Sequence, residues 1–600
     1  MKHIPFIFSV FLAISPASGQ EMKQLVILHT NDLHSHLNGF APEYNYSPLS
    51  INDDKTTGGF SRIAGLIAEE RKEHGDKLLV LDVGDFLMGT FYHFFEEETG
   101  FQLNLMKSMG YDAVSIGNHE FDFGPSMLAN MIKNAQKKGS PPVILSNIKF
   151  NEEEEGDDLL EQVYRENGIH PFLVLRRNGL TIGLFALMGE NAADVAPRAR
   201  PVTFADRLKT ASAIAGRLKK EEKADVVICL SHSGITLDKN GNWTGEDVKL
   251  ASHVPAIDLI ISGHTHTLLP RPLVVNNIPI IQAGANGGHV GKIVLTVTRG
   301  KLSVDSYRMI PIDDRIQGNP HIHAMIAAQK ELISTRILGP LDVSFDEPVA
   351  ELAYSLPWKP DSILEESTLG PLLADAIHSY VNRQPGLHAD IAMVAAGMIR
   401  DSLVAGKQTV ADLFRVVSLG KGDDKVPGYP LSMVYVNGKE LKSIIEILLV
   451  AYKSNTDNYF YYSGIRIHIA PWKGLLRKVR KIELADENES YSTIDFSKKN
   501  TRLYSLVTNS YILEFIGILK KMSFGLVNVV PKDKDGNPLH SMKQAVVDID
   551  TGTPGIQEGK EWIALLNYVR GFNDVNGNQI PDLPATYNTF VPRVIALKKE

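Results

Sequence analysis

The stretch DAVSIGNHEFDFGPSMLANMIKNAQKKG, residues 112–139, contains the pattern that decides the fold. A short apolar run ends at a glycine turn, and an amphipathic helical pattern follows it. Asn118, His119, Glu120 and Asp122 stand between the two. In open α/β sheets, ligands bind beyond the carboxyl ends of the strands. The stretch therefore predicts a strand–turn–helix unit of an α/β domain with a functional site at the turn.

The same alternation of strand and helix fills the first half of the chain. Continuous apolar strands that alternate with helices indicate sheets buried on both faces. A hairpin is expected where Asn178-Gly179 separates two strand-like runs. The other apolar runs cover residues 24–30, 77–85, 142–147, 224–232, 257–264 and 278–284, and amphipathic helical patterns cover residues 59–75 and 204–223.

The length of the chain predicts more than one domain. With 600 residues, 44% of them apolar, it is too long for a single core. The alternation ends near Ile312, and residues 319–339 have a helical pattern that suits a connector. The second domain mixes helices and strands, with one strand predicted over residues 461–470. We expect four segments: a signal peptide at 1–19, the first domain at 20–315, a linker helix at 316–340 and the second domain at 341–600.

The N-terminus and the overall charge bear on the location of the protein. A basic start, an apolar run and then small residues predict a cleaved secretory signal. Cys229 is the only cysteine and suits a buried core position. We therefore expect an exported protein, periplasmic or secreted. The net charge of -8 and the lack of a long basic cluster predict no nucleic-acid partner, and no later stretch is long enough to span a membrane.

Polar residues follow the predicted strands in a set that suits metal ions. Two aspartates, one asparagine and four histidines supply only oxygen and nitrogen donors, too many for one tetrahedral ion. They suit two ions bridged by a carboxylate, and such pairs, about 3.5–4 Å apart, activate water for phosphoryl transfer. Without thiolates the metal is open among Zn, Mn, Fe and Co. The seven candidate ligands are Asp32, His34, Asp85, Asn118, His232, His264 and His266.

The order of these fragments resembles a known family. D-x-H, then G-D, G-N-H-E, a single H and G-H-x-H is similar to the calcineurin-like metallophosphoesterases. The stretches ILHTNDLHSH, GNHEFDFG and SGHTH resemble more narrowly the 5'-nucleotidase family, of the bacterial 5'-nucleotidase or UDP-sugar hydrolase type. The resemblance implies an α/β fold: an N-terminal two-sheet αββα sandwich, a linker helix and a C-terminal α/β domain that binds the substrate.

The resemblance also implies a role for each residue of the set. Asp32, His34, Asp85 and His266 would hold one metal, and Asp85, Asn118, His232 and His264 the other, with Asp85 as the bridge. His119 would stabilise charge beside the leaving group. Asp122 would orient His119, although it also suits the start of the following helix as an N-cap. Glu120 has a structural position in this interpretation.

The second domain matches the family less closely. Arg400, in VAAGMIRDSLVAGK, stands where the family has a substrate-binding arginine, and an arginine can hold an anion through two hydrogen bonds. The two aromatic residues that stack on the base in the family are absent from their usual places. Tyr429, Tyr462 and Phe524 are alternatives, each also suited to the core. The base preference therefore stays open.

Together these features predict an exported dinuclear-metal phosphohydrolase. Its partner would be a small phosphate ester, first a 5'-nucleotide, cleaved by attack of a metal-activated hydroxide. Nucleotide sugars, 2',3'-cyclic nucleotides and non-nucleotide esters are alternatives within this chemistry, and a non-catalytic surface or binding protein is the alternative class. Residues 574–582 have the spacing of oxygen ligands for a structural calcium ion, or of a plain turn.

Overall fold

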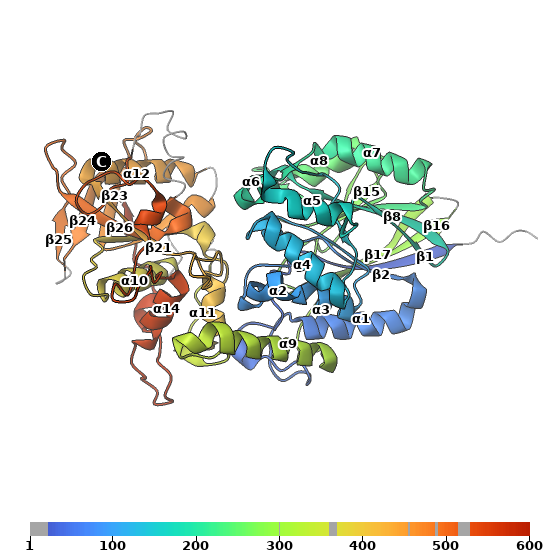
Figure 1. Cartoon of the computed structure of the whole chain (residues 1–600), viewed down its shortest axis with the longest axis horizontal. Helices are drawn as coiled ribbons and strands as arrows, with labels where there is room; N and C mark the ends of the chain where they lie inside the picture. Colours follow the sequence, from blue (N-terminus) through green and yellow to red (C-terminus); the bar gives the residue numbers. More distant parts are fainter. Residues whose placement is uncertain are drawn as a thin grey trace, which may run out of the picture.

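The computed structural model describes residues 22–298, 301–358, 369–453, 456–486, 490–513 and 529–599. The predicted signal peptide and Phe524 lie outside these residues. The chain forms two α/β domains, drawn in blue to green and in yellow to red in Figure 1. Within the described residues, no helix is both long enough and apolar enough to cross a membrane.

Two sheets form the centre of the N-terminal domain. The first has the order β17-β16-β1-β2-β3-β4-β6, with β1 to β6 parallel and β16 and β17 antiparallel at one edge. Its strands are β1 (Lys23–Thr30), β2 (Leu78–Asp82), β3 (Ala113–Ser115), β4 (Val143–Ile144), β6 (Ile169–His170), β16 (His289–Thr298) and β17 (Lys301–Pro311).

The second sheet has the order β14-β15-β13-β10-β8-β7. Its strands β8, β10, β13 and β15 are parallel, and β7 and β8 form the hairpin predicted at Asn178-Gly179. The strands are β7 (Leu173–Arg177), β8 (Leu180–Met188), β10 (Val226–His232), β13 (Leu259–Ser262), β14 (Leu273–Val275) and β15 (Ile278–Ile281). Two short ribbons pair β5 (Ile148–Lys149) with β9 (Thr203–Phe204) and β11 (Thr236–Leu237) with β12 (Trp243–Thr244).

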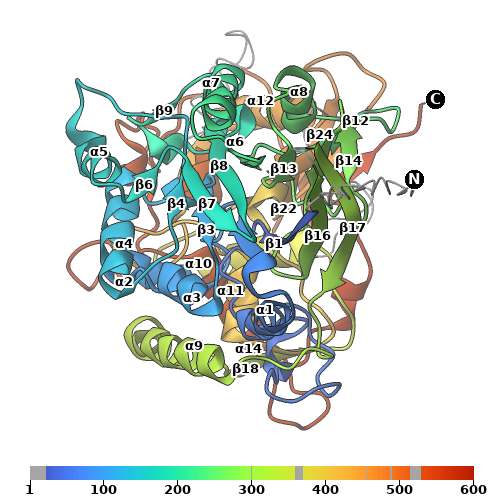
Figure 2. The same ribbon diagram turned by 90° about the vertical axis from the view of Figure 1, so that its right-hand side faces the viewer.

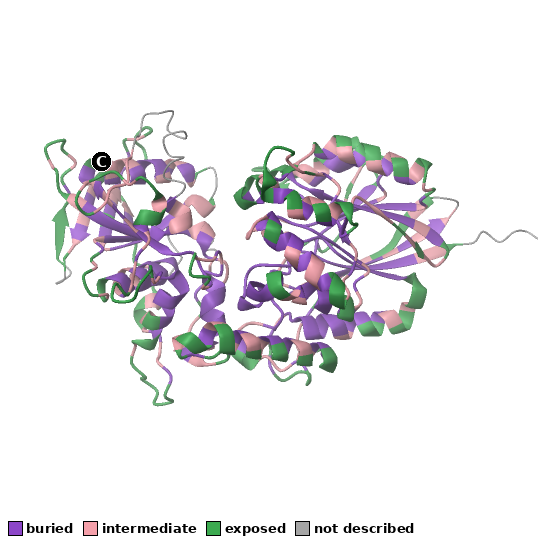
Figure 3. Ribbon diagram, viewed as in Figure 1, coloured by how far each residue is buried: buried purple, intermediate pink, exposed green. Residues whose placement is uncertain are grey.

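Helices cover the outer faces of the two sheets. Figure 2 shows α1 and α3 on one side and α7 and α8 on the other. The helices are α1 (Phe60–His74), α2 (Glu96–Thr99), α3 (Phe101–Met109), α4 (Pro125–Lys138), α5 (Asp158–Arg165), α6 (Glu190–Asp194), α7 (Arg207–Lys220) and α8 (Glu246–His253). Between the sheets lies an apolar core with residues such as Ile27, Leu81, Leu184 and Ile228. The predicted two-sheet αββα sandwich is confirmed, and the strands are mostly buried (Figure 3).

The C-terminal domain contains two four-stranded sheets. One has the order β21-β26-β19-β22 and the other β25-β24-β23-β27, while β18 pairs with β20. The strands are β18 (Pro348–Leu352), β19 (Ile391–Ala395), β20 (Gly406–Thr409), β21 (Leu431–Asn437), β22 (Phe460–Ser463), β23 (Ile465–Ile469), β24 (Val479–Ala485), β25 (Tyr491–Thr493), β26 (Leu503–Asn509) and β27 (Val594–Ala596). The helices are α10 (Leu369–Asn382), α11 (Val410–Val416), α12 (Gly438–Ala451) and α14 (Glu561–Arg570).

The single strand predicted over residues 461–470 is wrong. The chain breaks at Gly464, so β22 and β23 belong to different sheets. Gly464 has a φ of +82°, and a Cβ there would lie 2.1 Å from the Asp390 carbonyl oxygen. The apolar pattern continues through the break because both strands are buried, and this is why the sequence did not reveal it.

Helix α9 (Pro320–Ile333) lies within the segment predicted as a linker. It packs against α1 and α3 and runs beneath the junction of the two domains in Figure 1. Its predicted continuation is not α-helical: a π turn (Ser334–Leu338) and a 3-10 turn (Gly339–Leu341) complete the connection.

The two domains contact each other through both apolar and ionic groups. Phe91 and Phe414 stack with their ring centroids 3.8 Å apart. The buried guanidinium of Arg415 lies 2.9 Å from a Glu43 carboxylate oxygen in the N-terminal domain, and Asp412 and Asp401 bind the same guanidinium from the C-terminal domain. An aromatic stack and a buried ion pair therefore join the two domains.

Candidate metal centre

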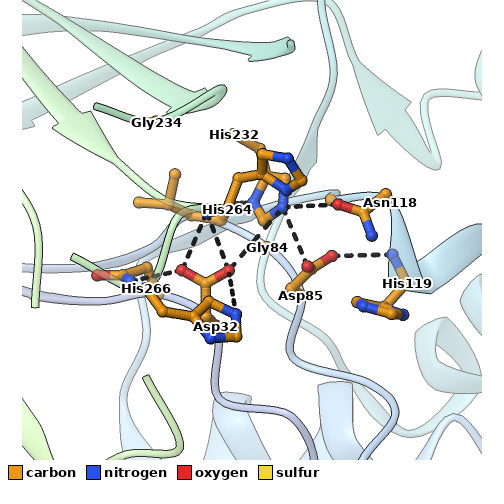
Figure 4. A network of polar contacts seen from close by, with 12 residues as sticks. Asp32, Gly84, Asp85, Asn118, His119, His232, Gly234, His264 and His266 are labelled. Atoms are coloured by element: carbon orange, nitrogen blue, oxygen red, sulfur yellow. Dashed lines mark hydrogen bonds and ion pairs between the residues drawn. The ribbon is translucent and has the colours of Figure 1, made fainter. Parts of the chain in front are cut away.

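The loops that follow five strands bring the predicted ligands together. Asp32 and His34 follow β1, Asp85 follows β2, and Asn118 follows β3 in the first sheet. His232 ends β10, and His264 and His266 follow β13 in the second sheet. Because these strands are parallel within each sheet, their carboxyl ends meet at one edge of the sandwich. Figure 4 shows the labelled side chains converging there.

The distances suit the capture of cations. Asp32, His34 and His266 each offer an atom within 4.8 Å of the others, and Asp85, His232 and His264 form a second such group. The Nε2 atoms of His34 and His266 lie 2.9 Å apart. The seven predicted ligands also include Asn118, whose Oδ1 lies 3.2 Å from Nε2 of His232.

The backbone at the centre is held in a costly conformation. The φ angles are +51° at Asp32, +47° at His34, +54° at Asp85, +72° at His264 and +53° at His266. Non-glycine residues in this left-handed region cost of the order of 1–3 kcal/mol each and cluster at functional sites. Five of the seven predicted ligands therefore adopt this conformation, among twenty non-glycine residues with positive φ in the described part of the chain.

Glu120 fixes the loop that carries Asp85. One carboxylate oxygen of Glu120 accepts hydrogen bonds from the backbone N–H groups of Asp85 at 2.9 Å and Gly117 at 2.6 Å. The other accepts from Leu87 N–H at 3.0 Å. Burial and the neighbouring Asp85 raise the pKa of Glu120 to about 7. Its role is to hold the backbone, in agreement with the structural position expected from the sequence.

Asn31 holds the loop that carries Asp32, and this role was not predicted from the sequence. Its Nδ2 donates to the Asp32 carboxylate and to the Gly284 carbonyl oxygen, both at 2.6 Å, and its Oδ1 accepts from Ala283 N–H at 2.8 Å. These bonds tie the loop after β1 to the loop after β15. The only signal in the sequence was an amide side chain directly before the D-x-H motif.

The histidine tautomers show that the centre suits a cation. The Nδ1 atoms of His34 and His232 face the carbonyl oxygens of Leu87 at 3.3 Å and Val83 at 2.9 Å. A neutral ring that donates from Nδ1 presents a lone pair at Nε2. For His232, this lone pair faces a carboxylate oxygen of Asp85 at 3.1 Å, so two acceptors meet. A cation between them would satisfy both.

The pKa values differ between the rings. Burial lowers the pKa of His264 and His266 to about 3, so both rings are neutral and able to coordinate a metal. Burial also lowers the pKa of His232, but the charge of Asp85 outweighs it and raises the pKa to about 10, so Nε2 of His232 holds a proton that faces Asp85, in the position that a metal cation would take over. The centre therefore attracts positive charge, which divalent ions would supply.

His119 and Asp122 form a pair beside the centre. Nδ1 of His119 lies 2.6 Å from a carboxylate oxygen of Asp122, while the backbone N–H of His119 donates to Asp85. Burial lowers the pKa of His119, and the charge of Asp122 raises it, with a net increase. Helix α4 is preceded by Gly124 at its N-cap, so Asp122 does not cap it. His119 also lies within 4.8 Å of ligand atoms on His34 and Asp85.

Arg400 comes to the centre from the C-terminal domain. Burial of the rings is the main cause that lowers the pKa of His34, His264 and His266, and the positive charge of Arg400 lowers it further. Tyr429 stacks on Tyr511 with ring centroids 5.1 Å apart. Tyr462 is buried in β22.

The residues 574–582 form a loop held by its own polar groups. Asp582 accepts from Val575 N–H, and Asp574 accepts from Gly577 N–H. The side-chain amide of Asn576 donates to Glu351 of β18 at 3.2 Å. These bonds fit a turn with or without calcium, and the calcium site stays a prediction.

Comparison with known proteins places this geometry in a family. The family model for calcineurin-like phosphoesterases matches residues 25–268, and the model for the 5'-nucleotidase C-terminal domain matches residues 358–517. Residues 25–268 are therefore a calcineurin-like phosphoesterase domain, the domain type of metal-dependent hydrolases of phosphate esters. Together the two matched domains are the domain pair of the 5'-nucleotidases.

Individual relatives agree with this assignment. The chain is 28% identical over 450 residues to the trifunctional nucleotide phosphoesterase protein YfkN of Bacillus subtilis, covering 70% of this chain but only 27% of that protein. It is 26% identical over 500 residues to an apyrase of Aedes albopictus, covering 78% and 80% of the two chains. The 5'-nucleotidase precursor of Thermus thermophilus has the same fold, with a TM-score of 0.67 at 20% identity over 96% of this chain and 100% of that one.

Proposed function

We propose that the protein hydrolyses 5'-nucleotides with two divalent metal ions. The observation that carries the proposal is the convergence of seven oxygen and nitrogen donors at one edge of the two-sheet sandwich, within reach of the charge of Arg400 from a 5'-nucleotidase-type domain. The names of the relatives, a nucleotide phosphoesterase and an apyrase, support a nucleotide as the substrate.

We propose that the donors divide into two sets that share Asp85. Asp85 has ligand atoms within 4.8 Å of His232 and His264, and in a separate group within 4.8 Å of His34 and His119. One set is Asp32, His34, Asp85 and His266, and the other is Asp85, Asn118, His232 and His264. Two divalent ions, Zn, Mn, Fe or Co, would polarise the phosphate and lower the pKa of a bound water.

His119 is proposed to stabilise charge on the substrate. Because Asp122 holds the proton on Nδ1 of His119, Nε2 is left for the phosphoryl oxygens or the leaving oxygen. Asp122 keeps the ring in position and favours its protonated form. The pair can therefore supply charge and a proton where the leaving group departs.

Arg400 is proposed to bind the substrate from the C-terminal domain. Its guanidinium acts on four histidines of the centre through its charge, which supports a place for it facing the phosphate. The planar guanidinium can donate two parallel hydrogen bonds to a phosphate, which an ammonium cannot reproduce.

The proposal extends to domain boundaries and location. The division into 20–315, 316–340 and 341–600 is supported by the end of β17 at Pro311 and by the place of α9. Export, to the periplasm or the medium, is proposed from the pattern of residues 1–19.

A substrate panel tests the function. The chain, stripped of metal with a chelator, is assayed with a 5'-nucleotide, a nucleotide sugar, a 2',3'-cyclic nucleotide and p-nitrophenyl phosphate, with and without added Mn²⁺ or Zn²⁺. We expect metal-dependent release of phosphate that is fastest from the 5'-nucleotide. Faster hydrolysis of another ester would change the assigned substrate but not the assigned reaction. Metal binding without hydrolysis of any ester would favour a non-catalytic binding protein.

A further inference from the structure

A buried carboxylate lies behind the metal centre, on the outer side of the second sheet. Asp247 is the second residue of α8, and its side chain is completely buried. One of its oxygens accepts a hydrogen bond from the Ser231 hydroxyl at 2.6 Å. The other accepts from the Ser262 hydroxyl at 2.6 Å and from Gly234 N–H at 3.2 Å. The carboxylate therefore joins the carboxyl ends of β10 and β13 to α8.

The two serines come just before ligands of the centre. Ser231 is followed directly by His232, and Ser262 stands two residues before His264. The serines are register partners in the parallel pair of β10 and β13. Asp247 thus holds both strands at the point where each one ends and its predicted ligand follows.

The alternation of side chains along β10 links the first serine to its ligand. Cys229 belongs to the apolar cluster beneath α7 and α8, whereas Leu230 faces the core between the two sheets. Successive side chains of a strand point to opposite faces. Ser231 continues the outer row, and His232 continues the inner row toward the first sheet. A bond that holds Ser231 toward α8 therefore also fixes the direction of His232.

The space around the His232 ring leaves little freedom to the end of β13. A Cβ at Gly117 would lie 2.7 Å from Cε1 of this ring, and a Cβ at Gly263 would lie 3.0 Å from its Nδ1. The backbone of both glycines therefore packs closely against the ring. Because Gly263 directly follows Ser262, a shift of this strand end would displace the ring.

The bond from Gly234 to Asp247 supports the loop of the other two histidines. Gly234, labelled in Figure 4, has a φ of +88°, and a Cβ there would lie 2.2 Å from Cγ2 of Thr265. Thr265 stands between His264 and His266. Asp247 therefore also fixes the turn against which this loop packs.

Stabilisation of α8 alone does not account for this carboxylate. An acidic residue in the first turn stabilises a helix through the helix dipole, but it can do so from the surface. Glu246 is in the same turn. Burial raises the pKa of Asp247 to about 6, because a buried charge costs free energy. An apolar residue would cover the strands without this cost, so the bonds to the strand ends are what the carboxylate provides.

We propose that Asp247 is a positioning residue of the metal centre. Through the two serines it sets the places of His232 and His264. The inference rests on the proposed dinuclear centre, but it concerns metal binding and is tested without turnover. Both histidines belong to the same proposed ligand set, so the ion bound by that set should depend on Asp247 more than the other ion does.

Metal binding by Asp247→Asn tests the inference. Asparagine keeps the shape of the side chain, but its NH₂ group replaces one acceptor and faces a donor. The metal-free protein is titrated with Mn²⁺ by calorimetry and with Co²⁺ by absorption. We expect two ions per wild-type chain, one of which binds about 10- to 100-fold more weakly in Asp247→Asn, the usual effect of changing the partners of a ligand. The Co²⁺ absorption, which reports the geometry of the donors, should change for that ion.

Asp258→Asn is the matched control, because Asp258 makes similar bonds near the amino ends of the same strands. Its carboxylate accepts from Val227 N–H at 2.7 Å and lies 2.5 Å from Nζ of Lys219. This variant should lower the thermal midpoint and leave both ions and the Co²⁺ spectrum as in the wild type. Ser262→Ala removes one bond but keeps the carboxylate, and it should weaken the same ion if Asp247→Asn does not fold.

Two ions bound by Asp247→Asn with wild-type affinity would overturn the inference. Equal weakening of both ions, or the same weakening in Asp258→Asn, would also overturn it, because the effect would then be one of general stability. A wild type that binds no divalent ion would overturn both proposals. Two ions in a wild type that hydrolyses no ester, one of them dependent on Asp247, would refute the proposed function and leave the positioning role in place.

Discussion

Replacing Glu120 by glutamine tests how the fold supports the metal centre. The Glu120 carboxylate is completely buried and accepts three backbone N–H groups, from Asp85, Leu87 and Gly117. Glutamine has nearly the same shape but only one acceptor oxygen. If that oxygen keeps the two donors Asp85 and Gly117, the amide NH₂ faces the N–H of Leu87, and one buried donor is left unpaired.

The expected cost follows from this count. One buried unpaired donor costs about 1–3 kcal/mol, and repulsion between the two N–H groups adds to it. The cost falls on the loop that carries Asp85, so the loop should move and the affinity for metal should fall with it. We expect a lower urea midpoint for the N-terminal domain and less metal bound per chain after dialysis against a weak chelator.

The assay combines urea unfolding, followed by fluorescence, with metal analysis of the dialysed protein. Glu69→Gln is the control, because Glu69 is exposed on α1 and its replacement removes the same charge. An unchanged midpoint and full metal content in Glu120→Gln would refute the reasoning. A lower midpoint with full metal content would show that Glu120 stabilises the fold but does not position the ligand.

The remaining predictions concern the centre itself. Asp85→Asn should lose at least one metal ion and its metal-dependent turnover, and two ions per chain with near-normal turnover would contradict the bridging role. His119→Ala should lower kcat by roughly 10²–10⁴-fold with metal content unchanged, and metal loss would make His119 a ligand. Arg400→Lys should raise KM for the nucleotide about tenfold or more and affect p-nitrophenyl phosphate less, because the fork geometry is lost. An equal loss of activity on both substrates would show that Arg400 supports the fold and does not bind the nucleotide.

The sequence pattern predicted strands buried on both faces and the seven donors because their signals are local, and the resemblance to a known family supplied the two-sheet sandwich. Each donor stands directly after a continuous apolar run, and parallel strands bring their carboxyl ends to one edge without further information. The pairing of His119 with Asp122 was implied by the resemblance, while the pattern alone also allowed Asp122 to cap the following helix. A donor that directly follows its strand end can be found by pattern alone.

Contacts between distant segments could not be found in this way. The bonds from Asn31 to Gly284 and from Glu120 to Leu87 depend on the packing of loops that are far apart in the chain. A cavity at the domain interface is lined by His93 of the N-terminal domain and Lys421 of the C-terminal domain, so it exists only where the two domains pack together. The break at Gly464 leaves the apolar pattern intact and changes only the backbone direction.

The strain at the centre explains why so many buried bonds surround it. Five left-handed residues cost about 5–15 kcal/mol together, which is as large as the whole net stability of a typical domain. Such a cost persists only where other interactions hold the backbone, and Asn31 and Glu120 supply six buried hydrogen bonds around the loops that carry Asp32 and Asp85. The positioning residues are therefore as necessary to the centre as its ligands, because without them the loops would relax and the donors would separate.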